Sequence, residues 1–174
     1  MDGSLISPPY WGLLFAVGVA SGYLNVLAGG GSVLVLPVLI VDDDEGMRDT
    51  LNAILRRDYR VLRAASGEAA LAILSREDVD LMLLDVRLPG IGGFDVLRIV
   101  KENYGLVEVL MISAITEIET AVQAMKFGAY HYTTKDFDYE TIRSLVNNAS
   151  ERQDLNRQVM KLSAQVADQS DLEF

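Results

Sequence analysis

Two short apolar runs that end abruptly in aspartate constrain the fold of this 174-residue chain more than any other feature. Residues 38–41 run into Asp42 and Asp43, and residues 81–84 run into Asp85. A strand that is buried on both faces of a parallel sheet reads as a continuous apolar run of this kind. Because ligands of open α/β sheets bind beyond the carboxyl ends of the strands, we expect the three carboxylates at one rim. Such carboxylates repel one another unless a hard cation joins them, and Mg²⁺ suits oxygen ligands beside a phosphate.

Strand and helix patterns alternate between residues 36 and 138, as expected of βαβ units around a parallel sheet. The predicted strands are residues 36–41, 59–64, 79–84, 107–113 and 130–134. The predicted helices follow them, with apolar side chains at helical spacing that are expected to face the sheet. In the helix predicted for residues 117–127 these are Ile118, Ala121, Val122 and Met125. The fold class is therefore α/β, with a five-stranded doubly wound parallel sheet.

Residues 139–174 contain neither glycine nor proline, and we predict one long helix there. Its first part would cover the sheet through Ile142, Val146 and Ala149. A heptad pattern follows, but it is consistently apolar only from Leu155 to Val166, which makes an isolated coiled coil weak. A solvated amphipathic tail is one interpretation. The favoured alternative is a homodimer formed through residues 145–166.

Residues 1–35 form a separate, apolar and glycine-rich segment. No charged side chain occurs between Asp2 and Asp42. This run exceeds the roughly 20 residues that a helix needs to cross a bilayer. Membrane association through residues 11–36 is therefore one interpretation. The segment joins the first predicted strand without a linker, so a fusion junction or a misassigned start is an equal alternative.

The charge balance and the missing cysteine exclude several classes of function. The net charge is −10, so no basic surface is expected and nucleic-acid binding by this chain is disfavoured. Without cysteine the chain cannot form disulfides or zinc–thiolate sites. The single histidine, His131, cannot form a metal cluster or a catalytic triad alone, and we interpret it as a surface side chain at a strand end.

Four motifs together resemble the receiver domain of two-component response regulators over residues 36–138. They are Val41-Asp-Asp-Asp44, Leu84-Asp-Val-Arg-Leu-Pro-Gly90, Met111-Ile-Ser-Ala114 and Gly128-Ala-Tyr-His-Tyr-Thr-Thr-Lys135, and each lies at the end of a predicted strand. The resemblance implies a flavodoxin-like or CheY-like fold, phosphorylation by a sensor histidine kinase and a cytoplasmic location. Catalysis would be limited to the chain's own phosphorylation and dephosphorylation.

The resemblance also implies roles for the acidic residues. Asp85 matches the phosphoacceptor, and Asp42 and Asp43 match the acidic pair that holds Mg²⁺. The backbone carbonyl of Arg87 matches a further metal ligand. Asp44 lies beside the pair, and we interpret it as a helix cap rather than a ligand.

The remaining motif residues match groups that respond to the phosphoryl group. Lys135 matches the lysine that pairs first with the aspartate and then with a phosphoryl oxygen. Ser113 matches the switch hydroxyl, with an ordinary strand-end hydroxyl as the alternative. Tyr132 matches the aromatic that moves inward, with plain core packing as the alternative. The family usually has Lys-Pro where this chain has Lys135-Asp136, so we expect a trans peptide bond there.

The region from residue 134 through the long helix resembles the receiver and linker of NtrC-type, sigma-54-dependent activators. In those proteins an ATPase domain and a DNA-binding domain follow, so the implied output domain is absent from this chain, which has no Walker motif. Residues 10–37 resemble the opening segment of TauE/SafE sulfite exporters, although one segment cannot form a transporter. A metal-dependent phosphatase is disfavoured because Arg87 stands where its second aspartate belongs. A non-phosphorylated interaction module, tethered to a membrane through the apolar segment, stays open.

Overall fold

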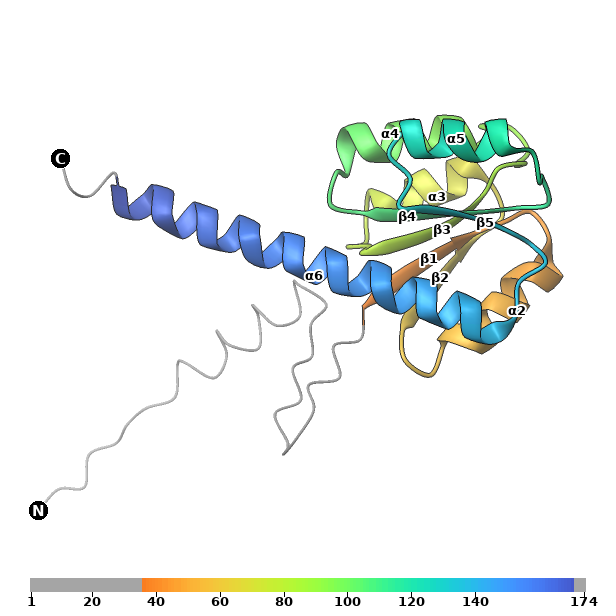
Figure 1. Cartoon of the computed structure of the whole chain (residues 1–174), viewed down its shortest axis with the longest axis horizontal. Coiled ribbons are helices and arrows are strands. Elements are labelled where there is room, and N and C mark those ends of the chain that lie inside the picture. Colours follow the sequence, from red (N-terminus) through yellow and green to blue (C-terminus); the bar gives the residue numbers. More distant parts are fainter. Residues whose placement is uncertain (1–35, 171–174) are drawn as a thin grey trace, which may run out of the picture. The chain divides into compact units, whose positions relative to one another are not determined.

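The computed structural model describes residues 36–170, with side chains as far as residue 163 (Figure 1). The expectations for residues 1–35, the membrane segment and the exporter resemblance among them, lie outside the described residues. Within residues 36–170, no helix combines the length and the hydropathy that a membrane span requires.

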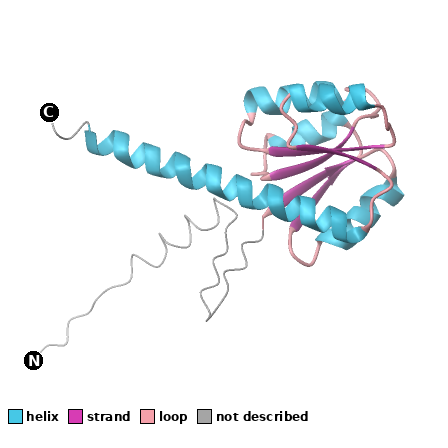
Figure 2. Cartoon of the chain, in the orientation of Figure 1, coloured by secondary structure: helices cyan, strands magenta, loops and turns pink. Residues whose placement is uncertain are grey.

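Five parallel strands form a single sheet in the order β2-β1-β3-β4-β5 (Figure 2). The strands are β1 (Pro37–Val41), β2 (Arg60–Ala64), β3 (Leu81–Asp85), β4 (Glu108–Ser113) and β5 (His131–Thr134). The expected doubly wound α/β fold is therefore confirmed. Because every strand runs the same way, all five carboxyl ends meet at one edge of the sheet, which we call the carboxyl edge. The opposite edge is the amino edge.

Five helices cover the two faces of this sheet in the described region. They are α2 (Glu45–Leu55), α3 (Gly67–Leu74), α4 (Gly93–Asn103), α5 (Ile118–Lys126) and α6 (Tyr139–Ser170). Helices α3, α4 and α5 cover one face, and α2 and α6 cover the other (Figure 1). Alternate residues of β1 enter the two cores, Leu39 on one side and Val38 and Ile40 on the other.

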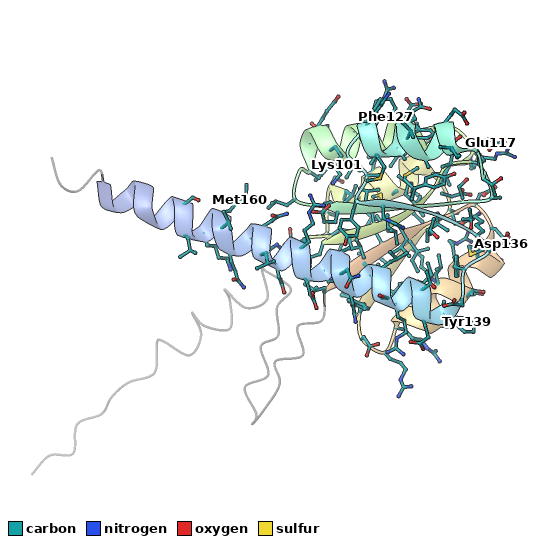
Figure 3. All side chains as sticks on the ribbon, viewed as in Figure 1. Lys101, Glu117, Phe127, Asp136, Tyr139 and Met160 are labelled. Carbon is teal, nitrogen blue, oxygen red and sulfur yellow. The ribbon has the colours of Figure 1, made fainter. Side chains whose placement is uncertain are left out.

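Helix α6 packs on the sheet through the three residues that the sequence predicts. Ile142, Val146 and Ala149 are fully buried against β3 and β4. Beyond them the helix continues past the sheet, and Figure 3 shows Met160 on this protruding part. The prediction of one long helix after residue 138 is confirmed for residues 139–170.

The face predicted for α5 is wrong. Ile118 is 76% exposed, and Val122 and Met125 are exposed as well, whereas Ala124 is the buried residue of this helix. A small side chain lets the helix lie close to the sheet. The neighbouring Phe127 then packs edge-on against Phe94 of α4, with 6.0 Å between the ring centroids. Helical spacing of apolar residues identifies a stripe, but it does not say what covers that stripe.

Gly93, the first residue of α4, lies against the backbone of the end of β3. An added Cβ at this position would come within 2.0 Å of the Asp85 carbonyl oxygen and 2.8 Å of the Val86 Cα. Both atoms belong to the main chain, so no side-chain rotation can relieve the overlap. The start of α4 therefore fixes the backbone that carries Asp85.

We predict that Gly93→Ala lowers the free energy of unfolding by about 2 to 3 kcal/mol, the upper range for overpacked sites. Urea denaturation followed by circular dichroism would measure the change. Gly105→Ala is the matched control, because its added Cβ lies 3.8 Å from the nearest atom, the Lys101 carbonyl oxygen. Equal stability of Gly93→Ala and the unmodified chain would contradict the close approach of α4 to β3.

Candidate functional site

Three carboxylates gather at the carboxyl edge where β1 and β3 end. Asp42 and Asp43 follow β1, and Asp85 is the last residue of β3. One oxygen from each lies within 4.8 Å of the others. Asp42 and Asp85 are buried and Asp43 is exposed, so the cluster opens to solvent on one side. The sequence predicted this grouping from the strand ends alone.

Lys135, directly after β5, joins two of these carboxylates. Its Nζ lies 2.8 Å from Asp42 Oδ2 and 2.8 Å from Asp85 Oδ2. Its own backbone N–H donates to the Ser113 carbonyl at 2.8 Å, which fixes the loop beside β4. Figure 3 shows Asp136, the next residue, at the same end of the domain as Glu117, which follows β4. Residues 36–170 contain no cis peptide bond, so Lys135-Asp136 is trans as expected.

Burial and charge pairing act in opposite directions on the pKa values of Asp42 and Lys135. Burial raises the pKa of Asp42, although hydrogen bonds from Lys135 and from the Asp44 N–H act in the opposite direction. Burial by itself would lower the pKa of Lys135, but the hydrogen bonds to Asp42 and Asp85 outweigh it, and the pKa is raised. The ammonium is therefore held in its charged form, and the carboxylates depend on positive charge in their midst.

The loop after β1 is held by two groups that belong to the start of α2. Asp44 caps the helix as expected, accepting from the N–H groups of Gly46 at 2.8 Å and Met47 at 3.4 Å. The Asp44 N–H donates to Asp42 Oδ1 at 2.9 Å and orients that carboxylate. Sequence reasoning missed Arg48, whose Nη1 donates to the Asp42 carbonyl at 2.7 Å. Its position one helical turn after the cap was the only signal available.

Arg87 lies in the loop after β3, with its side chain exposed. Its backbone N–H donates to Asp85 Oδ1 at 3.3 Å, which orients the carboxylate from the chain itself. The backbone of Arg87 therefore lies at the site, although its side chain is exposed to solvent. The same loop is tied to α3, because the Ile91 N–H donates to Glu68 Oε1 at 2.9 Å.

Ser113 and Tyr132 meet the loop that joins β4 to α5. Ser113 is fully buried at the end of β4, and its Oγ accepts from the Ile115 N–H at 3.1 Å. The half-buried Tyr132 donates its hydroxyl to the Ile115 carbonyl at 2.7 Å. Both residues thus contact one short loop from two neighbouring strands. His131, next to Tyr132, is exposed, as expected of a strand-end side chain.

The donor set fits a hard divalent cation. Three carboxylates within 4.8 Å of one another supply oxygen ligands, and Asp43 leaves one side accessible to solvent. Mg²⁺ prefers oxygen ligands and retains several waters, so a partly open carboxylate cluster suits it. The excess of negative charge over the single Lys135 ammonium favours a second positive charge here.

Comparisons with known proteins agree with this geometry. A family described as the response regulator receiver domain matches residues 38–147. An NtrX-like response regulator of Rickettsia felis is 39% identical over 140 residues, which are 79% of this chain and 30% of that protein. The crystal structure of NtrX from Brucella abortus in complex with ADP is 31% identical. It superposes with a TM-score of 0.70 over 74% of this chain and 30% of that one.

A receiver domain protein described as CheY-like, from Methanospirillum hungatei, superposes with a TM-score of 0.67 at 25% identity. It covers 70% of this chain and 98% of its own. The chain thus spans about a third of the NtrX-like relatives and nearly all of the solved Methanospirillum hungatei chain. The resemblance drawn from the four motifs is confirmed. The chain belongs to the family of response regulator receiver domains, the phosphoacceptor modules of two-component signalling.

Proposed function

We propose that Asp85 accepts a phosphoryl group from the phosphohistidine of a sensor histidine kinase. A carboxylate oxygen of Asp85 forms the bond to phosphorus while the bond between phosphorus and the imidazole nitrogen of the kinase breaks. The position of Lys135, 2.8 Å from both Asp42 and Asp85, is the observation that carries this assignment. An ammonium there can neutralise charge on a transferring phosphoryl oxygen, and such electrostatic positioning supplies most of the catalysis in phosphoryl transfer.

Asp42, Asp43, Asp85 and the backbone carbonyl of Arg87 would hold Mg²⁺ in this proposal. When bound, the ion supplies charge neutralisation that the single ammonium cannot provide alone. The chain's own contribution is orientation. The N–H groups of Asp44 and Arg87 hold Oδ1 of Asp42 and of Asp85, and Lys135 contacts Oδ2 of both.

Ser113 and Tyr132 would change their contacts in response to the phosphoryl group on Asp85. A phosphoryl oxygen on Asp85 is a strong acceptor, and the Ser113 hydroxyl is the neutral donor that the next strand supplies. Displacing Ser113 Oγ toward the phosphoryl group would lengthen the hydrogen bond that Oγ now accepts from the Ile115 N–H. Tyr132 holds the Ile115 carbonyl, so movement of that loop would release Tyr132 to move inward.

The switch would control an output domain located beyond α6. The NtrX-like relative is much longer than the region matched here. We infer that residues 36–138 form the receiver domain, and that residues 139–174 form its last helix, which extends into a coiled-coil-like dimerisation linker. The output would be of the sigma-54 activator type.

A homodimer through residues 145–166 would carry the signal between chains. Leu155, Val159 and Leu162 are 61%, 62% and 60% exposed, and they form one stripe at heptad spacing. Arg152, seven residues before Val159 on the same stripe, pairs with Glu108 of its own domain, so the apolar contact would begin at Leu155.

Asp85→Asn should abolish labelling by acetyl phosphate in Mg²⁺, because the amide is not a nucleophile toward phosphorus. Intact-mass spectrometry with peptide mapping measures the added phosphoryl group. Asp58→Asn is the control, since that exposed carboxylate pairs with Arg143 away from the cluster. Undiminished labelling of Asp85→Asn at another residue would contradict the assignment.

Ser113→Ala should still be labelled on Asp85, but the modification should no longer alter the domain. Two-dimensional amide NMR spectra recorded with and without beryllofluoride would show smaller shifts in the loop after β4. Ser113→Thr retains the hydroxyl and should restore the response. If Ser113→Ala responds like the unmodified chain, Ser113 has no switch role.

Leu155→Lys combined with Leu162→Lys should weaken self-association at least tenfold, because two ammonium groups per chain would face their symmetry mates. Sedimentation equilibrium measures the change. Met160→Lys makes the same chemical change on an equally protruding part of α6, off the heptad stripe, and should have little effect. Equal effects of both changes would argue against a specific seam.

A further inference from the structure

Two of the strands that lead to the candidate site, β3 and β4, each have a buried acidic side chain at their other end. Asp80 directly precedes β3, which ends at Asp85. Glu108 begins β4, which ends at Ser113. Both acidic side chains are buried at the amino edge, and the Glu108 N–H donates to the Asp80 carbonyl at 3.0 Å.

Asp80 is held by two side chains of α6. Gln153, which is fully buried, donates its Nε2–H to Asp80 Oδ1 at 2.9 Å. The Arg157 guanidinium, one turn farther along α6, contacts the same oxygen. Burial, with the carboxylates of Asp154 and Asp78 adding repulsion, raises the pKa of Asp80 to about 7. A carboxylate in this position therefore depends on the donors that α6 brings to it.

Glu108 is held by two side chains on a neighbouring row of α6, about 100° around the helix from Gln153 and Arg157. Its Oε1 lies 3.4 Å from Arg152 Nε and 3.4 Å from Asn156 Nδ2. Its Oε2 lies 3.5 Å from Nζ of Lys101 on α4. Figure 3 shows Lys101 at the far end of the domain from Asp136, so these contacts lie away from the carboxylate cluster.

Among the residues of α6 whose side chains are described, these polar contacts are the last that join the helix to its domain. The buried apolar contacts of the helix end at Ala149, and the large apolar side chains that follow in the described region are exposed. Leu155, Val159 and Leu162 lie roughly 180 to 240° around the helix from Gln153. The contacts of Gln153 with Asp80 therefore lie opposite the apolar stripe, whereas Arg152, seven residues before Val159, contacts Glu108 from the stripe's own side of the helix.

We propose that these residues form a clamp through which β3 and β4 control how α6 leaves the domain. The α6 clamp consists of Asp80 and Glu108 with Arg152, Gln153, Asn156 and Arg157. The inference rests on the proposed function, because the signal it transmits is the modification of Asp85. It adds the element that converts that modification into a change of the dimer stripe.

Strands β3 and β4 are suited to this role because each runs through the core from the amino edge to the carboxyl edge. Every residue of β3 and β4 is buried, and interiors of this kind transmit displacement instead of absorbing it. The clamp contacts are hydrogen bonds and ion pairs, and the Arg152 guanidinium also lies over the Tyr130 ring, 5.4 Å from its centroid. A surface pocket of about 330 Å³, bordered by Tyr104, Val107 and Arg157, leaves room beside it for rearrangement. The clamp would have two arrangements, closed with these contacts formed and open with them broken. Modification of Asp85 would shift the equilibrium between the two.

Reciprocity gives the test, because a coupling between two sites changes both equilibria by the same factor. Hydrogen exchange of the unmodified 174-residue chain would be measured in Mg²⁺ on peptides covering residues 150–157, with and without beryllofluoride. We expect beryllofluoride to change the exchange rate by roughly fivefold or more, the lower range of allosteric couplings. Gln153→Met retains the side-chain length and removes the donor to Asp80. It should accelerate exchange and change beryllofluoride affinity.

The effect of beryllofluoride on exchange in the unmodified chain decides the expected direction of the change in affinity. If beryllofluoride slows exchange in residues 150–157, Gln153→Met should bind it more weakly; if it accelerates exchange, the variant should bind it more tightly. Gln158→Met makes the same substitution at an exposed position on α6 and should change neither quantity. Glu108→Gln tests the contacts of Glu108 with Arg152 and Asn156. It replaces Gln153→Met in this experiment if that variant does not fold.

Two results would overturn the inference, and they are distinguishable. Faster exchange in Gln153→Met with unchanged beryllofluoride affinity would make the clamp a passive contact while leaving the proposed function intact. Failure of the unmodified chain to bind beryllofluoride and to label Asp85 would remove the proposed function itself, before any clamp variant is compared.

Discussion

The ion pairing of Lys135 with Asp42 and Asp85 is the interaction on which the site depends. Two ionised carboxylates that are buried side by side repel each other, and a close positive charge offsets both this repulsion and their desolvation. Lys135, which follows β5, provides that charge. It is positioned by the pairing of β5 with β4 and by its backbone N–H, which donates to the Ser113 carbonyl. The same contact therefore brings together the ends of β1, β3, β4 and β5.

This arrangement gives the domain two chemically different edges. At the carboxyl edge an acidic cluster faces solvent through Asp43, with a lysine and a buried serine beside it. At the amino edge the acidic residues Asp80 and Glu108 are covered by a helix and bound by its polar side chains. The first edge is open for chemistry, and the second is occupied by the element that leads away from the domain. Strands β3 and β4 have one end in each.

Much of the fold and of the site could be predicted, because both depend on short stretches of sequence such as apolar runs and helical spacing. Asp42, Asp43 and Asp85 each end an apolar run, and parallel strands place such ends together whatever the order of the strands. The burial of Ile142, Val146 and Ala149 followed from their spacing in the same way. The prediction for α5 was wrong because Ile118, Val122 and Met125 form an equally good stripe that nothing in the described region covers.

The sequence by itself determined which segments become strands and helices, and which residue types stand at the carboxyl edge, because periodicity and strand ends are local properties. Only the tertiary structure decided that Arg48 holds the loop after β1 and that Gln153 and Arg157 hold Asp80. Gln153 lies 73 positions from Asp80 in the chain. A hydrogen bond over such a separation depends on where two packed elements bring their side chains, and no local pattern records that.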